Sequence, residues 1–264
     1  MPSEKRKANR QQYLKAVKRS KKYERGLVLR EGMQGFLITC NNREKDTVRE
    51  SYNILNEYTD KLVGPEKKPD DNEEGSDQEE EDIDAAFDKE KSELKSESDK
   101  KPQERRFQQV ESGANNCIFI KTTIEDPHTI VDAIIDDIQD NQIQKCRFIQ
   151  RMLPILGTCK AYDKNIIELG EQLIPKMLKT VQFSTYSILF KPRNSNQVSK
   201  EMVYKIVGDI IKNCDGSSLW KLDLNNPEVS IVVEVIRNVC CIGFVSKFYQ
   251  RKKYNLLELV KQIT

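Results

Sequence analysis

The sequence predicts an α/β (α+β) protein with two folded domains and a polar insertion inside the first. Short β-branched and apolar runs alternate with amphipathic helical segments, a pattern typical of sheets packed against helices. The stretch from residue 65 to 104 interrupts this alternation. It consists largely of Glu, Asp, Ser and Lys and has too few apolar side chains to form a core.

The first domain is expected at residues 31–64 and 105–152. A buried strand is predicted at 35–40, followed by a helix from Asn42 that ends at Gly64-Pro65. After the insertion we expect a strand at 117–121, a helix with Asp126 as N-cap and Pro127 in its first turn, and a strand at 146–152. Because this order reads βαβαβ, a ferredoxin-like sandwich is the expected architecture.

The second domain is expected at residues 153–264. It should contain a helix over 163–178, a strand over 183–190 and a helix capped by Ser199, whose apolar residues recur at i, i+4 spacing. Two β-branched runs, 229–236 and 239–244, flank Arg237-Asn238 and predict a hairpin buried on both faces. This half therefore forms a separate α/β layer.

Charge is strongly segregated along the chain. Residues 1–30 carry 11 Lys or Arg against 2 Glu, whereas residues 65–100 carry 6 Lys against 16 Asp or Glu. We expect a disordered basic arm over 1–30, a disordered acidic linker over 65–104 and a mildly basic folded body. This layout suits an RNA-binding protein, because Lys and Arg displace counterions from phosphates. A solvated charged surface without a ligand is the alternative interpretation.

The sequence argues against several other classes of protein. The sequence has no apolar run of about 20 residues that could span a bilayer, and no secretory signal is evident. We therefore expect an intracellular protein that does not associate with a membrane. His128 is the only histidine and no glycine-rich phosphate loop is present, so we expect no catalytic or metal site and no cofactor. The seven cysteines lack zinc-knuckle spacing and are expected to be reduced and mostly buried.

The candidate binding residues are cationic side chains mixed with aromatic and amide groups. The best patch is the run 247–254, Lys-Phe-Tyr-Gln-Arg-Lys-Lys-Tyr, since its cations can contact phosphates while its rings stack on unpaired bases. Arg193 and Asn194 follow a predicted strand and offer a fork to a phosphate or a base edge. The predicted RNA-binding residues are Arg151, Lys160, Lys191, Arg193, Asn194, Lys247, Arg251, Lys252, Lys253 and Tyr254.

A series of strings, in order along the chain, makes it similar to a known family. They are Gly35-Phe-Leu-Ile-Thr-Cys40, Arg151-Met-Leu-Pro-Ile155 with Gly157-Thr-Cys-Lys-Ala161, Lys191-Pro-Arg-Asn194, Leu222-Asp-Leu-Asn-Asn-Pro227, Val232-Val-Glu-Val-Ile236 with Val239-Cys-Cys241, and Lys253-Tyr-Asn-Leu256. Over residues 35–62 and 113–264 the chain resembles THUMP-domain proteins, and in particular the eukaryotic THUMP domain-containing protein 1 family.

The resemblance implies an N-terminal ferredoxin-like domain followed by a THUMP domain, which together bind tRNA by its shape and acceptor end. The family is similar to a fungal protein needed for N4-acetylcytidine in the D-arm of serine and leucine tRNAs. There a separate RNA cytidine acetyltransferase carries out the reaction. The resemblance therefore implies a non-catalytic tRNA-binding adaptor. We expect a monomer inside the cell, with the nucleus or nucleolus and the cytoplasm as the open alternatives for its compartment.

Other functions stay open at this point. The same RNA-binding surface would suit a different tRNA-modification complex, with a methyltransferase or a thiolation enzyme, or a ribosome-assembly complex. The string Asn225-Asn-Pro-Glu228 resembles the Asn-Pro-Pro-Tyr motif of amino-methyltransferases that hold a flipped base. It lacks the second proline and the aromatic residue, and we interpret it as a turn between two strands.

Overall fold

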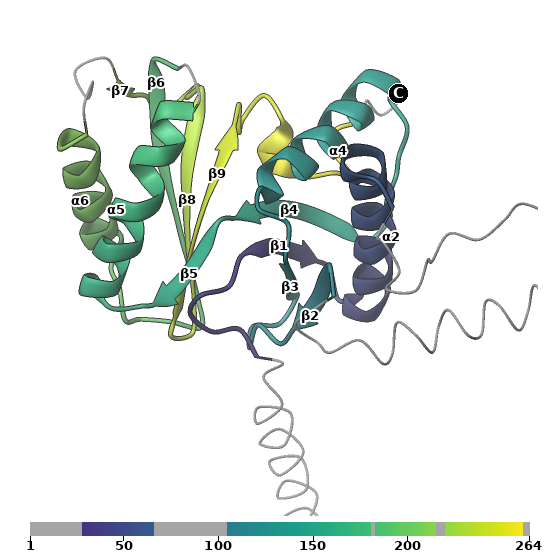
Figure 1. The fold of residues 1–264 in the computed structure, drawn as a ribbon, viewed down its shortest axis with the longest axis horizontal. Helices are drawn as coiled ribbons and strands as arrows, with labels where there is room; N and C mark the ends of the chain where they lie inside the picture. The colour runs from purple at the N-terminus through teal and green to yellow at the C-terminus, as the bar shows by residue number, and fades with distance from the viewer. Residues whose placement is uncertain (1–27, 66–104, 181–182, 215–219, 261–264) are drawn as a thin grey trace, which may run out of the picture.

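The computed structural model describes residues 28–65, 105–180, 183–214 and 220–260, which form two sheets with paired helices (Figure 1). The predicted basic arm, apart from residues 28–30, and the predicted acidic linker, apart from residue 65, lie outside the described residues. Within the described ranges, no helix combines the length and the apolar character needed to cross a membrane.

The first domain is an antiparallel four-stranded sheet in the order β2-β3-β1-β4. Its elements are β1 (Gly35–Cys40), α2 (Glu44–Val63), β2 (Phe107–Val110), β3 (Cys117–Thr122), α4 (Pro127–Asn141) and β4 (Ile149–Ile155). The order βαββαβ is the ferredoxin-like arrangement, and both helices cover one face of the sheet (Figure 1). The sequence prediction had missed β2. The boundary expected after residue 152 falls inside β4, because β1 pairs with this strand as far as Ile155.

Local sequence determines where helix α4 begins and which of its faces is buried. The Asp126 side chain accepts a hydrogen bond from the His128 backbone N–H at 3.0 Å, and Pro127 occupies the first turn, as predicted. The helix buries one apolar face, formed by Ile130, Val131, Ile134, Ile135 and Ile138. Burying this face against the sheet stabilises the domain through the hydrophobic effect.

The second domain is a five-stranded sheet in the order β5-β9-β8-β6-β7, with α5 and α6 on one face (Figure 1). Its elements are β5 (Gly157–Lys160), α5 (Asp163–Thr180), β6 (Thr185–Arg193), α6 (Lys200–Lys212), β7 (Lys221–Leu222), β8 (Val229–Ile236), β9 (Val239–Ser246) and the 3-10 turn η2 (Lys252–Tyr254). Strands β8 and β9 form the predicted hairpin, and β6 runs parallel to β8.

The β8–β9 hairpin is buried on both faces, which confirms the prediction. One face joins the core beneath α5 and α6 through Ile231, Val233, Val235, Ile242 and Phe244. The other face packs against the first domain through Val232, Ile236, Val239, Cys241 and Val245. Alternating side chains of the same two strands therefore hold both domains together.

Two further features fix one domain against the other. At Gly243 the two sheets touch, since a Cβ atom added there would lie 2.0 Å from the carbonyl oxygen of Pro154 in β4. After η2 the chain returns to the open edge of β4, where the Leu256 N–H donates to the Gln150 carbonyl oxygen at 2.9 Å. The described C-terminal residues thus belong to the interface between the domains.

Candidate nucleic-acid interface

The structure brings three of the predicted residues together between the two sheets. Arg151 lies on β4 of the first domain, and Lys191 and Arg193 lie on β6 of the second. The pKa of Lys191 is lowered, first by its partial burial and then by the neighbouring Arg193 charge, and Arg151 acts in the same direction. These residues, named here the inter-sheet cluster, therefore interact electrostatically although they come from different domains.

Arg193 is partly committed to a buried acid. Its Nε donates to the Glu234 carboxylate at 2.6 Å, and its Nη2 lies 3.4 Å from the second oxygen. Glu234 on β8 is buried. Burial alone would lower the pKa of Arg193, but the Glu234 carboxylate more than offsets this and raises it. One edge of the Arg193 guanidinium, which was predicted to contact a phosphate, thus faces Glu234. Arg193 therefore neutralises a buried acid between the sheets.

Lys160 and Asn194 lie at the same end of the second sheet. Lys160 pairs with Val239, Val239 pairs with Ile236, and Ile236 pairs with Arg193, so Lys160 and Arg193 occupy one row across four strands. Lys160 is exposed and its Nζ lies 3.5 Å from Glu31. Asn194 is exposed, has a φ of 51° and donates from Nδ2 to the Gly113 carbonyl oxygen at 3.4 Å.

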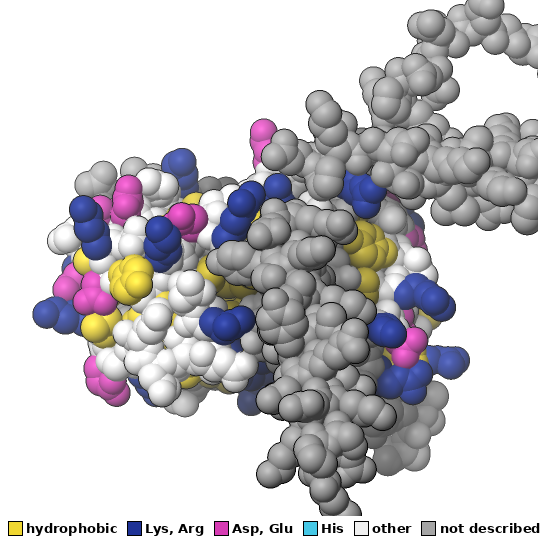
Figure 2. All heavy atoms as spheres, turned by 90° about the horizontal axis from the view of Figure 1, so that it is seen from below, with side chains coloured by type: hydrophobic (Ala, Val, Ile, Leu, Met, Phe, Trp, Pro, Cys, Tyr) yellow, Lys and Arg dark blue, Asp and Glu magenta, His cyan; other side chains and the backbone are white. Residues whose placement is uncertain are grey.

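The chain enters the described structure near this row. Val28 forms a bridge with Glu111, and the Gly32 N–H donates to the Thr158 carbonyl oxygen at 2.8 Å on β5, the strand that ends at Lys160. Residues 28–32, where the described part of the chain begins, therefore lie near the row that contains Lys160 and Arg193. Figure 2 views the molecule from the side of the β8–β9 turn, where Lys and Arg side chains spread over both domains with Asp and Glu among them.

The predicted residues 247–254 lie elsewhere. Ser246 pairs with Val229 at the start of β8, whereas Arg193 pairs with Ile236 at its end. Seven positions along β8 separate these pairs, a distance of roughly 23 Å. The predicted cations therefore form two regions and not one continuous patch. We refer to residues 247–254 as the C-terminal turn.

Two of the predicted RNA-binding residues in the C-terminal turn, Arg251 and Tyr254, have structural roles. Arg251 ion-pairs with Asp132 and, at 2.8 Å, with Asp136, both on α4. Tyr254 is fully buried, and its hydroxyl donates to the Ser246 carbonyl oxygen at 3.0 Å. Burial raises the pKa of Tyr254 to about 12. The stacking role predicted for Tyr254 is corrected by this burial, and Arg251 ties the turn to the first domain.

The exposed residues of the C-terminal turn include its lysines and Tyr249, which belongs to the predicted patch but is absent from the predicted set of RNA-binding residues. Lys247, Lys252 and Lys253 are exposed and have φ values of 50°, 50° and 57°, so an irregular backbone directs them outward. The Tyr249 side chain is 38% exposed, and the Lys253 Nζ lies 5.9 Å from its ring centre. Tyr249 replaces Tyr254 as the aromatic ring available for a base.

Arg237 is a further cation near this site that is absent from the predicted set of RNA-binding residues. It occupies the β8–β9 turn with a φ of 56°, and its backbone N–H donates to the Arg193 carbonyl oxygen at 2.9 Å. Its side chain lies close to Gly113, where an added Cβ would be 2.5 Å from its Cδ. The hairpin prediction had placed Arg237 in a turn, and the parallel β6–β8 pairing that brings it to Arg193 carries no local sequence signal.

Comparisons with known proteins point to one family. The THUMP domain family model matches residues 160–245. The chain is 39% identical over 252 residues to THUMP domain-containing protein 1 from Bos taurus, covering 95% of this chain and 70% of that protein. It is also 39% identical over 233 residues to THUMP domain-containing protein 1 from Homo sapiens, covering 88% of this chain and 65% of that protein.

Among solved structures, the solution structure of the THUMP domain of THUMP domain-containing protein 1 is 31% identical. It covers 31% of this chain and 81% of that chain, with a TM-score of 0.28. The extent of the sequence identity and the matched THUMP domain together show that the chain belongs to the THUMP domain-containing protein 1 family.

Proposed function

We propose that this protein is a non-catalytic adaptor that binds tRNA and presents it to a separate RNA cytidine acetyltransferase. The product would be N4-acetylcytidine in the D-arm of serine and leucine tRNAs. The observation that carries the RNA-binding part is the convergence of Arg151, Lys160 and Lys191 on one face from two domains. The acetyltransferase part rests on the family resemblance.

The inter-sheet cluster suits a polyanion for a physical reason. Arg151, Lys191 and Arg193 repel one another, which is why the two arginines lower the pKa of Lys191. A phosphate placed among them would relieve that repulsion and release its own counterions. The β4–β9 contact fixes the spacing of these charges, so the surface can select RNA by its shape as well as its charge.

The experiment combines purified acetyltransferase, acetyl-coenzyme A and a serine tRNA transcript, with and without the chain. N4-acetylcytidine in the tRNA is then measured by mass spectrometry. We expect acetylation to require both proteins and the chain alone to form no product. Acetylation at the same rate without the chain would refute the adaptor role, and acetylation by the chain alone would make it the enzyme.

The RNA-binding part has its own measurement. The chain should shift the mobility of the same tRNA at low salt, and the shift should weaken steeply as salt rises. Absence of a shift at low salt would exclude direct tRNA presentation, whatever the acetylation assay shows.

A further inference from the structure

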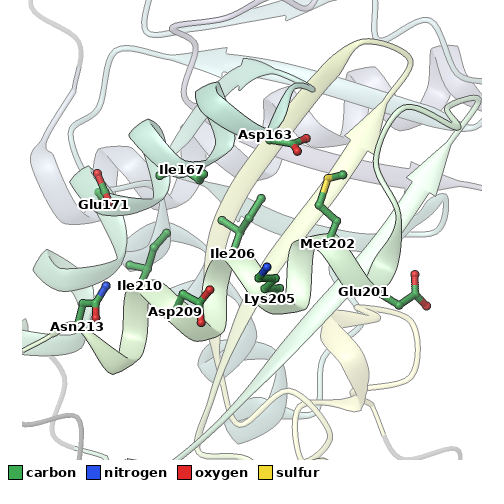
Figure 3. Close-up of a pocket in the computed structure, with 10 residues that line it drawn as sticks. All are labelled: Asp163, Ile167, Glu171, Glu201, Met202, Lys205, Ile206, Asp209, Ile210 and Asn213. Atoms are coloured by element: carbon green, nitrogen blue, oxygen red, sulfur yellow. The ribbon is translucent and has the colours of Figure 1, made fainter.

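The outer side of the second domain carries a groove between α5 and α6. It encloses about 550 Å³, and its floor is apolar, formed by Ile167 of α5 and by Met202, Ile206 and Ile210 of α6. Figure 3 shows the side chains of Met202, Ile206 and Ile210 directed toward α5. Ile167 is 38% exposed, so this floor is accessible to solvent.

The rim of the groove is acidic. Asp163 and Glu171 line it from α5, and Glu201 and Asp209 line it from α6, against one lining cation, Lys205. Asp209 is also paired with Lys212, whose Nζ lies 3.9 Å from its carboxylate. All four carboxylate residues are exposed. Because these charges repel phosphates, the groove is unsuited to RNA, and it favours a ligand that is positively charged and apolar at once.

The groove also faces away from the row of the second sheet that contains Lys160 and Arg193. Helices α5 and α6 pack on the face of the sheet that presents Val233, Val235 and Ile242. Lys160 and Arg193 pair with Val239 and Ile236, which belong to the opposite face. A ligand in the groove would therefore leave the inter-sheet cluster open to RNA.

We propose that the groove between α5 and α6 is the docking site for a basic amphipathic helix of the acetyltransferase partner. This inference rests on the proposed function. The lining residues run from Glu201 to Asn213, the length of α6, or about 18 Å at 1.5 Å per residue. Three to four turns of a partner helix span such a length, with apolar residues on the floor and Lys or Arg at the rim.

The test compares two glutamates of the same helix. Glu171 lines the groove and Glu168 does not, yet both are exposed. Binding of purified acetyltransferase to the immobilised full chain is measured for wild type, Glu171→Lys and Glu168→Lys. We expect Glu171→Lys to weaken binding about tenfold and Glu168→Lys to leave it within about twofold. Ile167→Ser, which removes apolar floor without changing charge, should also weaken binding.

Several outcomes overturn the inference and separate it from the proposed function. If wild type binds the acetyltransferase and all three variants bind equally well, the docking site lies elsewhere and the adaptor role survives. If wild type does not bind the acetyltransferase at all, the result contradicts both the docking site and the adaptor role. If binding appears only after residues 1–27 are deleted, the chain's own basic arm occupies the groove. In each variant the tRNA mobility shift should match wild type, which confirms the fold.

Discussion

At the scale of single residues, the most consequential pair is Arg193 and Glu234. Both side chains lie between the two sheets, with exposed fractions of 15% and 6%. A buried carboxylate without its partner is costly, whereas removing both charges is much less so. The pair therefore links the stability of the domain interface to a residue predicted to bind RNA.

Removing one partner should show this cost directly. We expect Arg193→Ala to lower the free energy of unfolding by about 3 kcal/mol, because Glu234 is left buried and unpaired. The double variant Arg193→Ala/Glu234→Ala should recover part of that loss. Urea denaturation of the two single variants and the double variant measures the coupling. Strictly additive losses would show that the pair does not interact.

The two tyrosines of the C-terminal turn give a second prediction. Tyr254 is buried and Tyr249 is exposed. Tyr249→Ala should weaken tRNA binding by about 1 to 3 kcal/mol if its ring stacks on a base. Tyr254→Phe should leave the affinity unchanged and lower stability by about 1 kcal/mol, because the hydroxyl bonds to Ser246 are lost. Fluorescence anisotropy with labelled tRNA and urea denaturation distinguish the two effects, and the reverse pattern would restore Tyr254 as the contact.

The cysteines give a prediction about thiol reactivity at pH 8. Burial raises the pKa of Cys117 to about 11 and that of Cys146 to about 12, so both stay protonated and unreactive at pH 8. Cys214 is half-buried, and the other six are buried, in agreement with the prediction that most of the thiols are buried. A disulfide reagent at pH 8 should modify one thiol quickly in the native chain and all seven in urea. Cys214→Ser should abolish the fast phase; several fast thiols in that variant would contradict the burial.

Residue roles were the part least accessible from sequence. The cations of the C-terminal turn look alike along the chain, yet Arg251 is bound to Asp132, 119 positions away, while Lys252 and Lys253 are exposed. Nothing local distinguishes a structural arginine from an exposed lysine. Likewise, Tyr249 and Tyr254 differ only in which of them the tertiary structure buries. The residue types predicted the class of ligand, but burial decides which of these side chains are available to bind it.

At the scale of elements, regular helices were the most predictable. Helix α6 begins where Ser199 accepts a hydrogen bond from the Met202 N–H at 3.2 Å, and its apolar face was readable from i, i+4 spacing. Strand β2 was missed because Phe107–Val110 is short and half polar. It exists because β3 offers it an edge, which is a tertiary cause.

Two glycines provide a matched test of element packing. Gly243 lies where β9 meets β4, and a Cβ there would clash with the Pro154 carbonyl oxygen. Gly208 lies in α6 with nothing within 4 Å of an added Cβ. Gly243→Ala should destabilise the protein by more than about 2 kcal/mol, whereas Gly208→Ala should stabilise it by about 1 kcal/mol. Thermal and urea unfolding measure both, and a neutral Gly243→Ala would argue against the close contact between the sheets.

At the scale of the whole molecule, the two domains form one surface because three separate features join them. These are the buried hairpin, the Gly243 contact and the return of the C-terminal segment onto β4. The order of the domains followed from the sequence, but their mutual placement did not, since every contact of this kind joins distant residues. That placement is what brings Arg151 to Lys191.

The central claim is that tRNA binds the face that carries the inter-sheet cluster. The most direct measurement is the salt dependence of tRNA affinity for Arg151→Ala/Lys160→Ala/Lys191→Ala, compared with Lys164→Ala/Lys205→Ala/Lys212→Ala, which removes three exposed charges from α5 and α6. We expect the first variant to bind more weakly, with a slope reduced by about 0.9 for each lost phosphate contact, and the second to match wild type. Equal losses in both variants, or a loss confined to the second, would contradict the claim.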